Sequence, residues 1–450
     1  CNVSHDYIKW PRLTDLCSES PSNGLFEKRG GALIDIAKDA LAQRIEIYYD
    51  PNVDWETVKG LDTGLSKKAA GFEPEKVRAK VQAAENYDRE KIKRYAVRPF
   101  DTRWCYYSSV SPLWNRSRPT LYVQLWQGNY FLMSRPAGVA KPEGVPVFCT
   151  QALGDNDFLR GHAYYFPLQL RYTSVGTSDL SAKQMAIEGI ENAAEVKIIA
   201  NLSDTARAYL AKLKITNPDR DAETASILWM HALAIGYSPS YLAENADGIR
   251  QDWPRIPLPD NCETLLASAQ LGRQIAALLD TETPTPGVTS GKIRPELLAI
   301  AVVARVGGGN LNPDTEFAVT ARWGSRDKKG ITMPRQGKSE QRLYTAEERQ
   351  AMGETIGQLG QNTRDIYLND VAYWQNVPTR VWNYTIGGYQ VIKKWLSYRE
   401  RDLLGRPLKQ EEVREVTYMA RCLGALLLLQ PELDANYEAV KRSPYQWKSQ

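Results

Sequence analysis

The sequence has few of the residues on which metal and nucleophilic centres depend. It contains only 3 histidines and 6 cysteines in 450 residues. The cysteines show no CxxC spacing, and together with His5, His162 and His231 they form no zinc ligand set. No disulfide framework is implied either, so we expect a reduced, intracellular protein that binds no metal.

Long hydrophobic runs are also missing. No stretch of about 18 apolar residues could cross a bilayer, and the N-terminal residues lack the basic-then-apolar pattern of a secretory signal. A membrane is therefore not an expected partner. The sequence begins at Cys1 rather than at a methionine, and we expect it to be a piece of a longer protein.

The catalytic motifs that we searched for are not found. NPDR (217–220) and NPDT (312–315) lack the second proline and the aromatic residue of the [NDS]PP[YF] element of adenine methyltransferases. RVGGGN (305–310) lacks the lysine and hydroxyl of a P-loop. DREK (88–91) has the letters of a PD-(D/E)xK nuclease without its strand context, and no histidine lies near a G-x-S-x-G element. We predict that this chain carries no catalytic site and no cofactor of its own.

Basic side chains, in contrast, are concentrated in two segments. The whole chain has a net charge of +4, whereas residues 89–118 hold eight basic and two acidic side chains, a balance of +6. Residues 322–342 hold seven basic and two acidic side chains, a balance of +5. Two such concentrations suit a polyanion such as DNA, although two solvated loops would give the same counts.

Changes in residue pattern divide the chain into five parts. Between 46 and 180, short apolar and aromatic runs alternate with turn residues, which indicates strands. Between 181 and 280, Ala and Leu recur at three- and four-residue spacing, which indicates helices. The predicted parts are a connector from a missing upstream domain (1–45), a β-rich lobe 1 (46–180), a helical spacer (181–280), an α/β lobe 2 (281–405), and a C-terminal helix with a tail (406–450). Within the last part, the apolar stripe predicts a helix over 408–429.

Four sequence blocks resemble a known family. They are VRPFDTRWCYY (97–107) with LWNRSRP (113–119), YYFPLQL (164–170), YSPSYLAENADGIRQDWPRIPLP (237–259) and VPTRVWNYTIGGYQVIKKWLSYRERDLLGRPL (377–408). In this order they resemble the C-terminal target-recognition region of Type ISP single-polypeptide restriction–modification enzymes and of related large adenine methyltransferases of phage defence. Residues 281–343 match the family pattern poorly.

The resemblance implies a function and partners. It implies an α+β, multi-lobed module that recognises a specific sequence of double-stranded DNA in the cytoplasm of a prokaryote. An upstream methyltransferase domain or subunit would bind S-adenosylmethionine and methylate the adenine that this module positions. Two other functions stay open at this point: a protein-interaction scaffold of a defence complex, and a divergent nuclease.

Basic side chains in loops and on one helix are the candidates for DNA contact, because arginine and lysine bind phosphates and arginine also reads guanine edges. The candidates are Arg103, Arg116, Arg118, Arg135, Lys328, Lys329, Arg335, Lys393, Lys394 and Arg399. For Arg98 and Asp101 we instead predict an ion pair that holds the fold.

Overall fold

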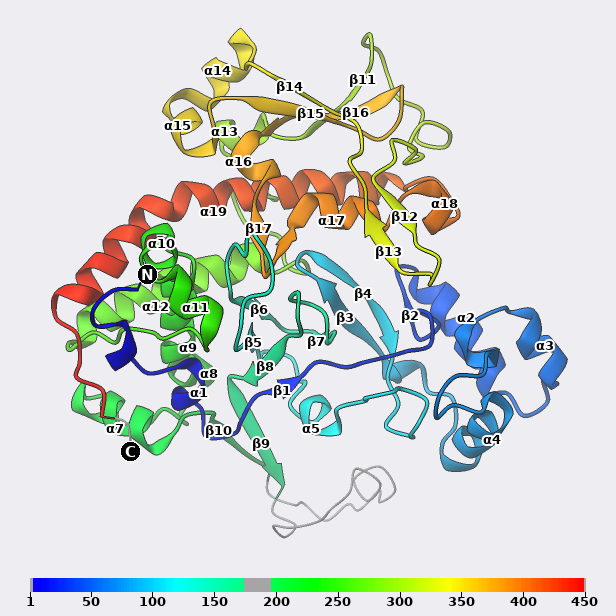
Figure 1. Cartoon of the computed structure of the whole chain (residues 1–450), viewed down its shortest axis with the longest axis horizontal. Helices are drawn as coiled ribbons and strands as arrows, with labels where there is room; N and C mark the ends of the chain where they lie inside the picture. The colour runs from blue at the N-terminus through cyan, green and yellow to red at the C-terminus, as the bar shows by residue number, and fades with distance from the viewer. Residues whose placement is uncertain (1–2, 174–195, 449–450) are drawn as a thin grey trace.

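The long C-terminal helix α19 (Gln410–Arg442) runs across the middle of the computed structural model, which describes residues 3–173 and 196–448 (Figure 1). The sequence predicts that this helix ends near Leu429, but the structure continues it through Pro431. A proline inside a helix removes one backbone hydrogen bond. Leu433 and Tyr437, beyond the proline, are buried, and their packing offsets that loss.

Lobe 1 lies on one side of α19 and is built around two four-stranded sheets (Figure 1). The first has the order β2-β4-β3-β7, in which β3 and β4 form an antiparallel hairpin and β7 runs parallel to β3. The second has the order β1-β8-β5-β6 and is antiparallel throughout. The bounds are β1 (Ser22–Asn23), β2 (Ile34–Asp35), β3 (Ile92–Arg98), β4 (Asp101–Tyr106), β5 (Phe131–Ser134), β6 (Phe148–Thr150), β7 (Leu153–Gly154) and β8 (Tyr164–Pro167).

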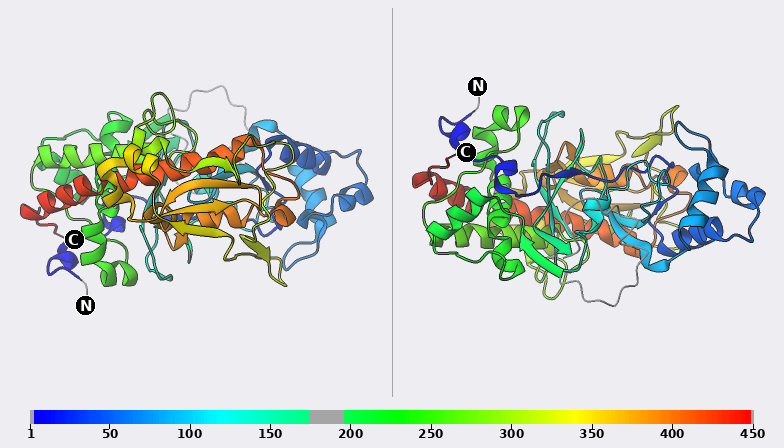
Figure 2. Two further views of the ribbon diagram at one scale, coloured as in Figure 1. Left: turned by 90° about the horizontal axis from the view of Figure 1, so that it is seen from above. Right: turned by 90° about the horizontal axis from the view of Figure 1, so that it is seen from below.

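Short helices cover the far end of lobe 1. They pack Leu41, Ile45 and Val81 into the core. Figure 2 shows α2 to α4 at one end of the long axis and the helical spacer at the other. These helices are α2 (Lys38–Tyr49), α3 (Trp55–Gly60) and α4 (Pro74–Ala84); two other short helices are α5 (Pro119–Tyr122) and α1 (Leu13–Leu16), and α1 lies beside the helical spacer (Figure 1).

The helical spacer packs around α9 (Ile227–Gly236), whose ten residues are all buried. Helix α12 (Cys262–Leu279) approaches α9 closely, because a Cβ atom on Gly272 would lie 1.8 Å from the carbonyl oxygen of Met230. The predicted boundary at 180/181 falls in residues 174–195, outside the described residues. The remaining elements are β9 (Gln169–Thr173), β10 (Val196–Ala200), α7 (Asp204–Lys212), α8 (Ala222–Ala225), α10 (Pro239–Glu244) and α11 (Ala246–Gln251).

The four-stranded antiparallel sheet of lobe 2 lies on the opposite side of α19 from lobe 1, whereas α17, β17 and the β12 and β13 strands lie on the side of lobe 1 (Figure 1). The order of this sheet is β11-β16-β15-β14. A separate two-stranded ribbon, β12 and β13, extends from it beside α17 and α18. The elements are α13 (Pro295–Leu298), β11 (Val302–Arg305), β12 (Gly324–Arg326), β13 (Thr332–Pro334), β14 (Ser339–Arg342), α14 (Ala346–Met352), α15 (Ile356–Leu359), β15 (Thr363–Tyr367), β16 (Ala372–Pro378), α16 (Thr379–Trp382), β17 (Thr385–Ile386), β18 (Tyr389–Gln390), α17 (Val391–Ser397) and α18 (Arg401–Leu404). The predicted α+β class, with several small sheets and a helical part, is confirmed.

Candidate nucleic-acid interface

The β12–β13 hairpin, residues 324–335, forms a basic ribbon whose turn is fixed by its own sequence, DKKGI. The backbone N–H groups of Lys329 and Ile331 both donate to the Asp327 carboxylate at 2.8 Å. Gly330 adopts a φ of 79°, the left-handed conformation that closes a three-residue hairpin loop. The N–H of Asp327 also donates to the carbonyl of Ile331 at 2.9 Å. The tip of the ribbon is therefore held in one conformation.

The root of the ribbon is buried against the segment that follows α17. The backbone N–H groups of Arg322 and Trp323 donate to the Glu400 carboxylate at 3.1 and 2.9 Å, and the Trp323 indole donates to the Tyr367 carbonyl at 2.7 Å. A Cβ atom on Gly324 would lie 1.9 Å from the Ser397 carbonyl oxygen, so only glycine fits there. A rigid root thus carries an exposed tip.

The cations of the ribbon are free to bind a ligand. Arg326, Lys328 and Lys329 are exposed and have no ion-pair or hydrogen-bond partner for their side chains within residues 3–173 and 196–448. Among the described residues, the Arg335 guanidinium donates only to the Ser325 hydroxyl, at 2.6 Å. Three of the sequence candidates, Lys328, Lys329 and Arg335, are therefore brought together on one solvent-facing element.

Two other candidates, Arg103 and Arg399, converge on a buried carboxylate. Asp101 accepts two hydrogen bonds from Arg103, at 3.1 and 2.9 Å, and two from Arg399, both at 2.8 Å. Asp101 and Arg399 are 1% and 2% exposed. Burial opposes ionisation of Asp101, but the two guanidinium groups hold the pKa of its carboxyl well below its usual range. This cluster joins β4 to the end of α17, and Arg399 has no surface with which to reach DNA.

The predicted pair of Arg98 and Asp101 is wrong. Although the two residues face each other across the β3–β4 hairpin, the Arg98 guanidinium donates to Asp155 at 3.1 Å. The aromatic rings of Tyr389 and Tyr398 also lie within 5.4 and 6.0 Å of it. Asp101 is already fully occupied by two other arginines, and this occupation is the physical reason for the difference.

A second group of cations lies where lobe 1 meets α17. Lys394 lies 5.3 Å from the ring of Tyr389 and 4.8 Å from that of Tyr398. Burial lowers the pKa of Lys394 to about 8, and the positive charges of Arg98, Arg103 and Arg160 contribute to this shift. We call these four cations, Arg98, Arg103, Arg160 and Lys394, the basic seam. The neighbouring candidate Lys393 is half-buried on the same helix.

The remaining candidates lie elsewhere in lobe 1. Arg116 is exposed, and Arg118 is half-buried and donates to the Gly24 carbonyl at 3.2 Å. Arg135 is 3% exposed and forms an ion pair with Glu143. The structure does not bring these three together with the basic ribbon, and Arg135 is enclosed by the fold.

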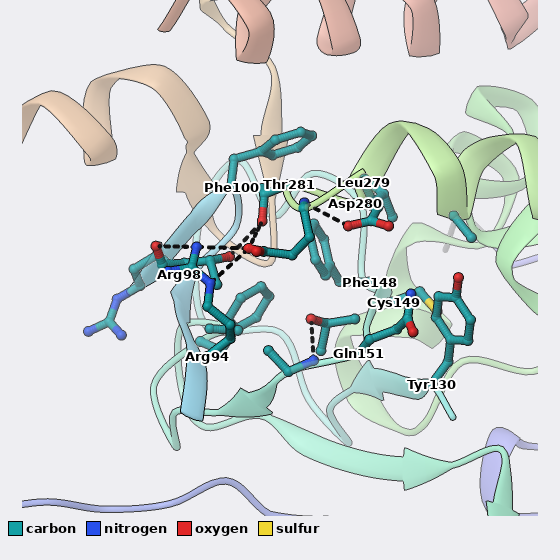
Figure 3. A pocket seen from close by; sticks show the side chains of 17 residues that line it. Arg94, Arg98, Phe100, Tyr130, Phe148, Cys149, Gln151, Leu279, Asp280 and Thr281 are labelled. Carbon is teal, nitrogen blue, oxygen red and sulfur yellow. Dashed lines mark hydrogen bonds and ion pairs between the residues drawn. The ribbon is translucent and has the colours of Figure 1, made fainter. Parts of the chain in front are cut away.

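Arg94, another cation of the first basic segment, lines a pocket beside β3 (Figure 3). The Arg94 guanidinium donates to Glu282 at 2.9 and 2.7 Å, and the hydroxyls of Thr102 and Thr281 lie 2.9 Å apart. The cavity has a volume of about 110 Å³, well below the roughly 300 Å³ at which ligand pockets begin. It is a packing gap between lobe 1 and the end of α12 rather than a nucleotide site.

One serine–histidine pair is relevant to the question of an unrecognised catalytic site. His231 Nδ1 lies 2.6 Å from the Ser268 hydroxyl, and His231 Nε2 lies 2.7 Å from the Pro257 carbonyl. Because a carbonyl only accepts, Nε2 donates and Nδ1 accepts from the serine. Both side chains are 0% exposed, and burial lowers the pKa of His231 to about 4. The pair is closed to any substrate and acts as internal packing.

Metal-binding clusters and membrane-spanning helices are both absent from the described residues. Within residues 3–173 and 196–448, no group of three or more His, Cys, Asp or Glu side chains could hold a metal ion. In the same residues, no helix combines the length and apolarity needed to cross a bilayer.

The comparisons place this architecture among the specificity modules of restriction–modification enzymes. Residues 19–417 match the family model of the Type ISP C-terminal specificity domain, and the chain belongs to that family. The matched residues include lobe 1, the helical spacer and lobe 2. No curated protein matches the sequence significantly.

Solved structures share the fold at low sequence identity. A nuclease-deletion mutant of the Type ISP restriction–modification enzyme LlaGI, in complex with a DNA substrate mimic, matches with a TM-score of 0.52 and 13% identity over 96% of this chain and 34% of its own. The DrdV–DNA complex matches with a TM-score of 0.53 and 17% identity, over 93% of this chain and 35% of its own. The ATP-dependent Type ISP enzyme LlaBIII bound to DNA matches with a TM-score of 0.53 and 11% identity, over 100% of this chain and 25% of its own. This chain thus spans about a third or less of the length of these enzymes.

Proposed function

We propose that this chain recognises a specific sequence of duplex DNA and positions the target adenine for a methyltransferase domain of the same enzyme. The single observation that carries the proposal is the exposed basic ribbon, in which Arg326, Lys328 and Lys329 have no carboxylate partner within residues 3–173 and 196–448. Such cations bind phosphates, and a two-stranded ribbon fits the major groove of B-DNA. Membership of the specificity-domain family supports the same function.

The candidate residues fall into two roles in this proposal. Lys328, Lys329 and Arg335 on the ribbon contact phosphates and groove edges directly. Lys394 of the basic seam, with Lys393 beside it, forms a second positive surface where lobe 1 meets α17, whereas Arg103 is paired with Asp101 and is left out. Arg116 and Arg118 lie on a separate loop and add a peripheral contact. Arg135 and Arg399 are left out of the proposed interface, because their side chains are buried against carboxylates.

The methyl transfer itself belongs to the rest of the enzyme in this proposal. An upstream domain or subunit supplies S-adenosylmethionine, flips the adenine out of the duplex and methylates it. By binding its target sequence, this chain determines which base pair lies at the active site of the methyltransferase domain. The enzyme acts in the cytoplasm of a prokaryote, where the free thiols of this chain stay reduced.

Selection of bound duplexes from a randomised pool tests the proposal. We expect one enriched asymmetric sequence, whose affinity falls less steeply with salt than that of random DNA. Binding of random DNA alone, without enrichment, would contradict sequence recognition by this chain. No binding at either of two salt concentrations would favour the scaffold function, and metal-dependent cleavage of the pool would favour the nuclease.

A further inference from the structure

The basic ribbon carries two large apolar side chains that are exposed to solvent. Ile331 is 56% exposed and Met333 is 44% exposed. Met333 lies opposite Ser325 in the ladder, and Arg335 donates to the Ser325 hydroxyl. Because side chains alternate along a strand, Ile331, Met333 and Arg335 point to one face of the ribbon. That face therefore combines two apolar groups with one arginine.

This combination limits the kind of partner that the face can take. The free cations Arg326, Lys328 and Lys329 lie on the turn and edge of the same ribbon, so the partner must be strongly negative around a small apolar centre. The major groove of DNA has this arrangement, with phosphates along both walls and the thymine C5-methyl as the apolar group on its floor. An acidic protein surface would also satisfy the charges, but it offers no reason for a narrow ribbon with a fixed tip.

We propose that Ile331 and Met333 read thymine by enclosing its C5-methyl group in the major groove. This inference rests on the proposed function and assigns base discrimination to two side chains that carry no charge. Lys328 and Lys329 at the turn neutralise phosphates of the groove walls, and Arg335 extends along the same face as the apolar pair. The hydrogen-bonded turn fixes the backbone that carries both apolar side chains before binding, so little backbone conformational entropy is lost.

A thymine-to-uracil scan of the selected sequence tests this inference. Uracil keeps every hydrogen-bonding group of thymine and lacks only the methyl. For the unchanged chain, we expect replacement of one or two particular thymines to weaken binding about fourfold, which corresponds to the burial of one methyl group. In the double variant Ile331→Ala with Met333→Ala, binding is weaker at the start, and the same replacements have no further effect.

Leu343→Ala provides a matched control. Leu343 is 65% exposed, follows β14 in lobe 2 and is not part of the ribbon. This variant should keep the full sensitivity to uracil. Melting temperatures of all variants should equal that of the unchanged chain, because no apolar core is altered.

The outcomes separate this inference from the function on which it rests. If no sequence is enriched from the pool, the proposed function fails and the inference fails with it. If one sequence is enriched but no thymine in it is sensitive to uracil, recognition stands and the methyl contact is wrong. If the double variant keeps the sensitivity of the unchanged chain, other residues read the thymine and the inference is overturned.

Discussion

The two basic segments, residues 89–118 and 322–342, have almost the same local charge but differ in how their cations are paired. In the first, most cations pair with carboxylates of the fold, and these pairs are Arg89–Asp39, Lys91–Glu85, Arg94–Glu282, Arg98–Asp155 and Arg103–Asp101. In the second, Lys338 and Arg342 also pair with carboxylates, but Arg326, Lys328 and Lys329 around the turn have no ion-pair or hydrogen-bond partner within the described residues. A local excess of charge therefore does not identify a binding surface, because the neutralising carboxylates can come from distant parts of the chain.

Removal of Asp101 should give the largest effect, because it leaves two arginines without their carboxylate. We expect Asp101→Asn to lower the free energy of unfolding by about 3–5 kcal/mol, the usual cost of breaking a buried ion pair on one side. Urea unfolding followed by circular dichroism measures it. Asp39→Asn, which removes a pair on the exposed surface of the same segment, should cost about 0–1 kcal/mol. Equal losses in the two variants would contradict the structural role of the first segment.

The same carboxylate should make stability sensitive to acid. Because the pKa of Asp101 is depressed in the folded chain, its stabilisation is complete above the unfolded pKa of about 3.9 and is lost as the pH falls further towards the folded value. The difference in unfolding free energy between the unchanged chain and Asp101→Asn should therefore be constant from pH 7 to pH 5 and shrink below about pH 4. A difference that shrinks already between pH 7 and pH 5 would assign the effect to another group.

For the second segment, the expected effect is on binding and not on stability. Lys328→Ala with Lys329→Ala should weaken DNA binding roughly tenfold near physiological salt, and the slope of log affinity against log salt should flatten by about 2. Fluorescence anisotropy at several salt concentrations measures both quantities. Lys9→Ala with Lys212→Ala removes the same charge from exposed positions of the helical end and should change neither. An equal loss of DNA affinity in both double variants would mean that the ribbon contributes only through the net charge of the chain.

The smallest effect should come from the basic seam, where Arg98 and Arg103 are paired with carboxylates as in the first segment and Lys394 lies beside two tyrosine rings. With a pKa of about 8 in the free chain, Lys394 loses its proton between pH 7 and pH 9. If it contacts a phosphate, affinity should fall about two- to threefold over this range, since an anion favours the protonated form. In Lys394→Arg, which stays charged, this pH dependence should disappear. If affinity changes with pH in the same way in the unchanged chain and in Lys394→Arg, Lys394 does not contact the DNA.

Local features of the fold could be predicted from the sequence, whereas its long-range pairs could not. The sequence DKKGI determines the ribbon turn, since Asp327 and Gly330 are the residues that such a turn requires. Arg399 is a sequence candidate for DNA contact, but the structure pairs it with Asp101, 298 positions away in the chain. No periodicity or spacing indicates such a partner. The continuation of α19 through Pro431 likewise depends on tertiary packing that outweighs the local preference of proline.

Two consecutive residues hold the ribbon in place, and this arrangement has a consequence for how new specificities arise. Arg399 donates to Asp101 of lobe 1, and the next residue, Glu400, accepts hydrogen bonds from two backbone N–H groups at the root of the ribbon. Neither contact uses a side chain of the tip, and Lys328, Lys329 and Ile331 contribute nothing to the core. Substitutions at those three positions should therefore leave the fold intact, so the proposed interface could be varied at the tip while the scaffold stays unchanged.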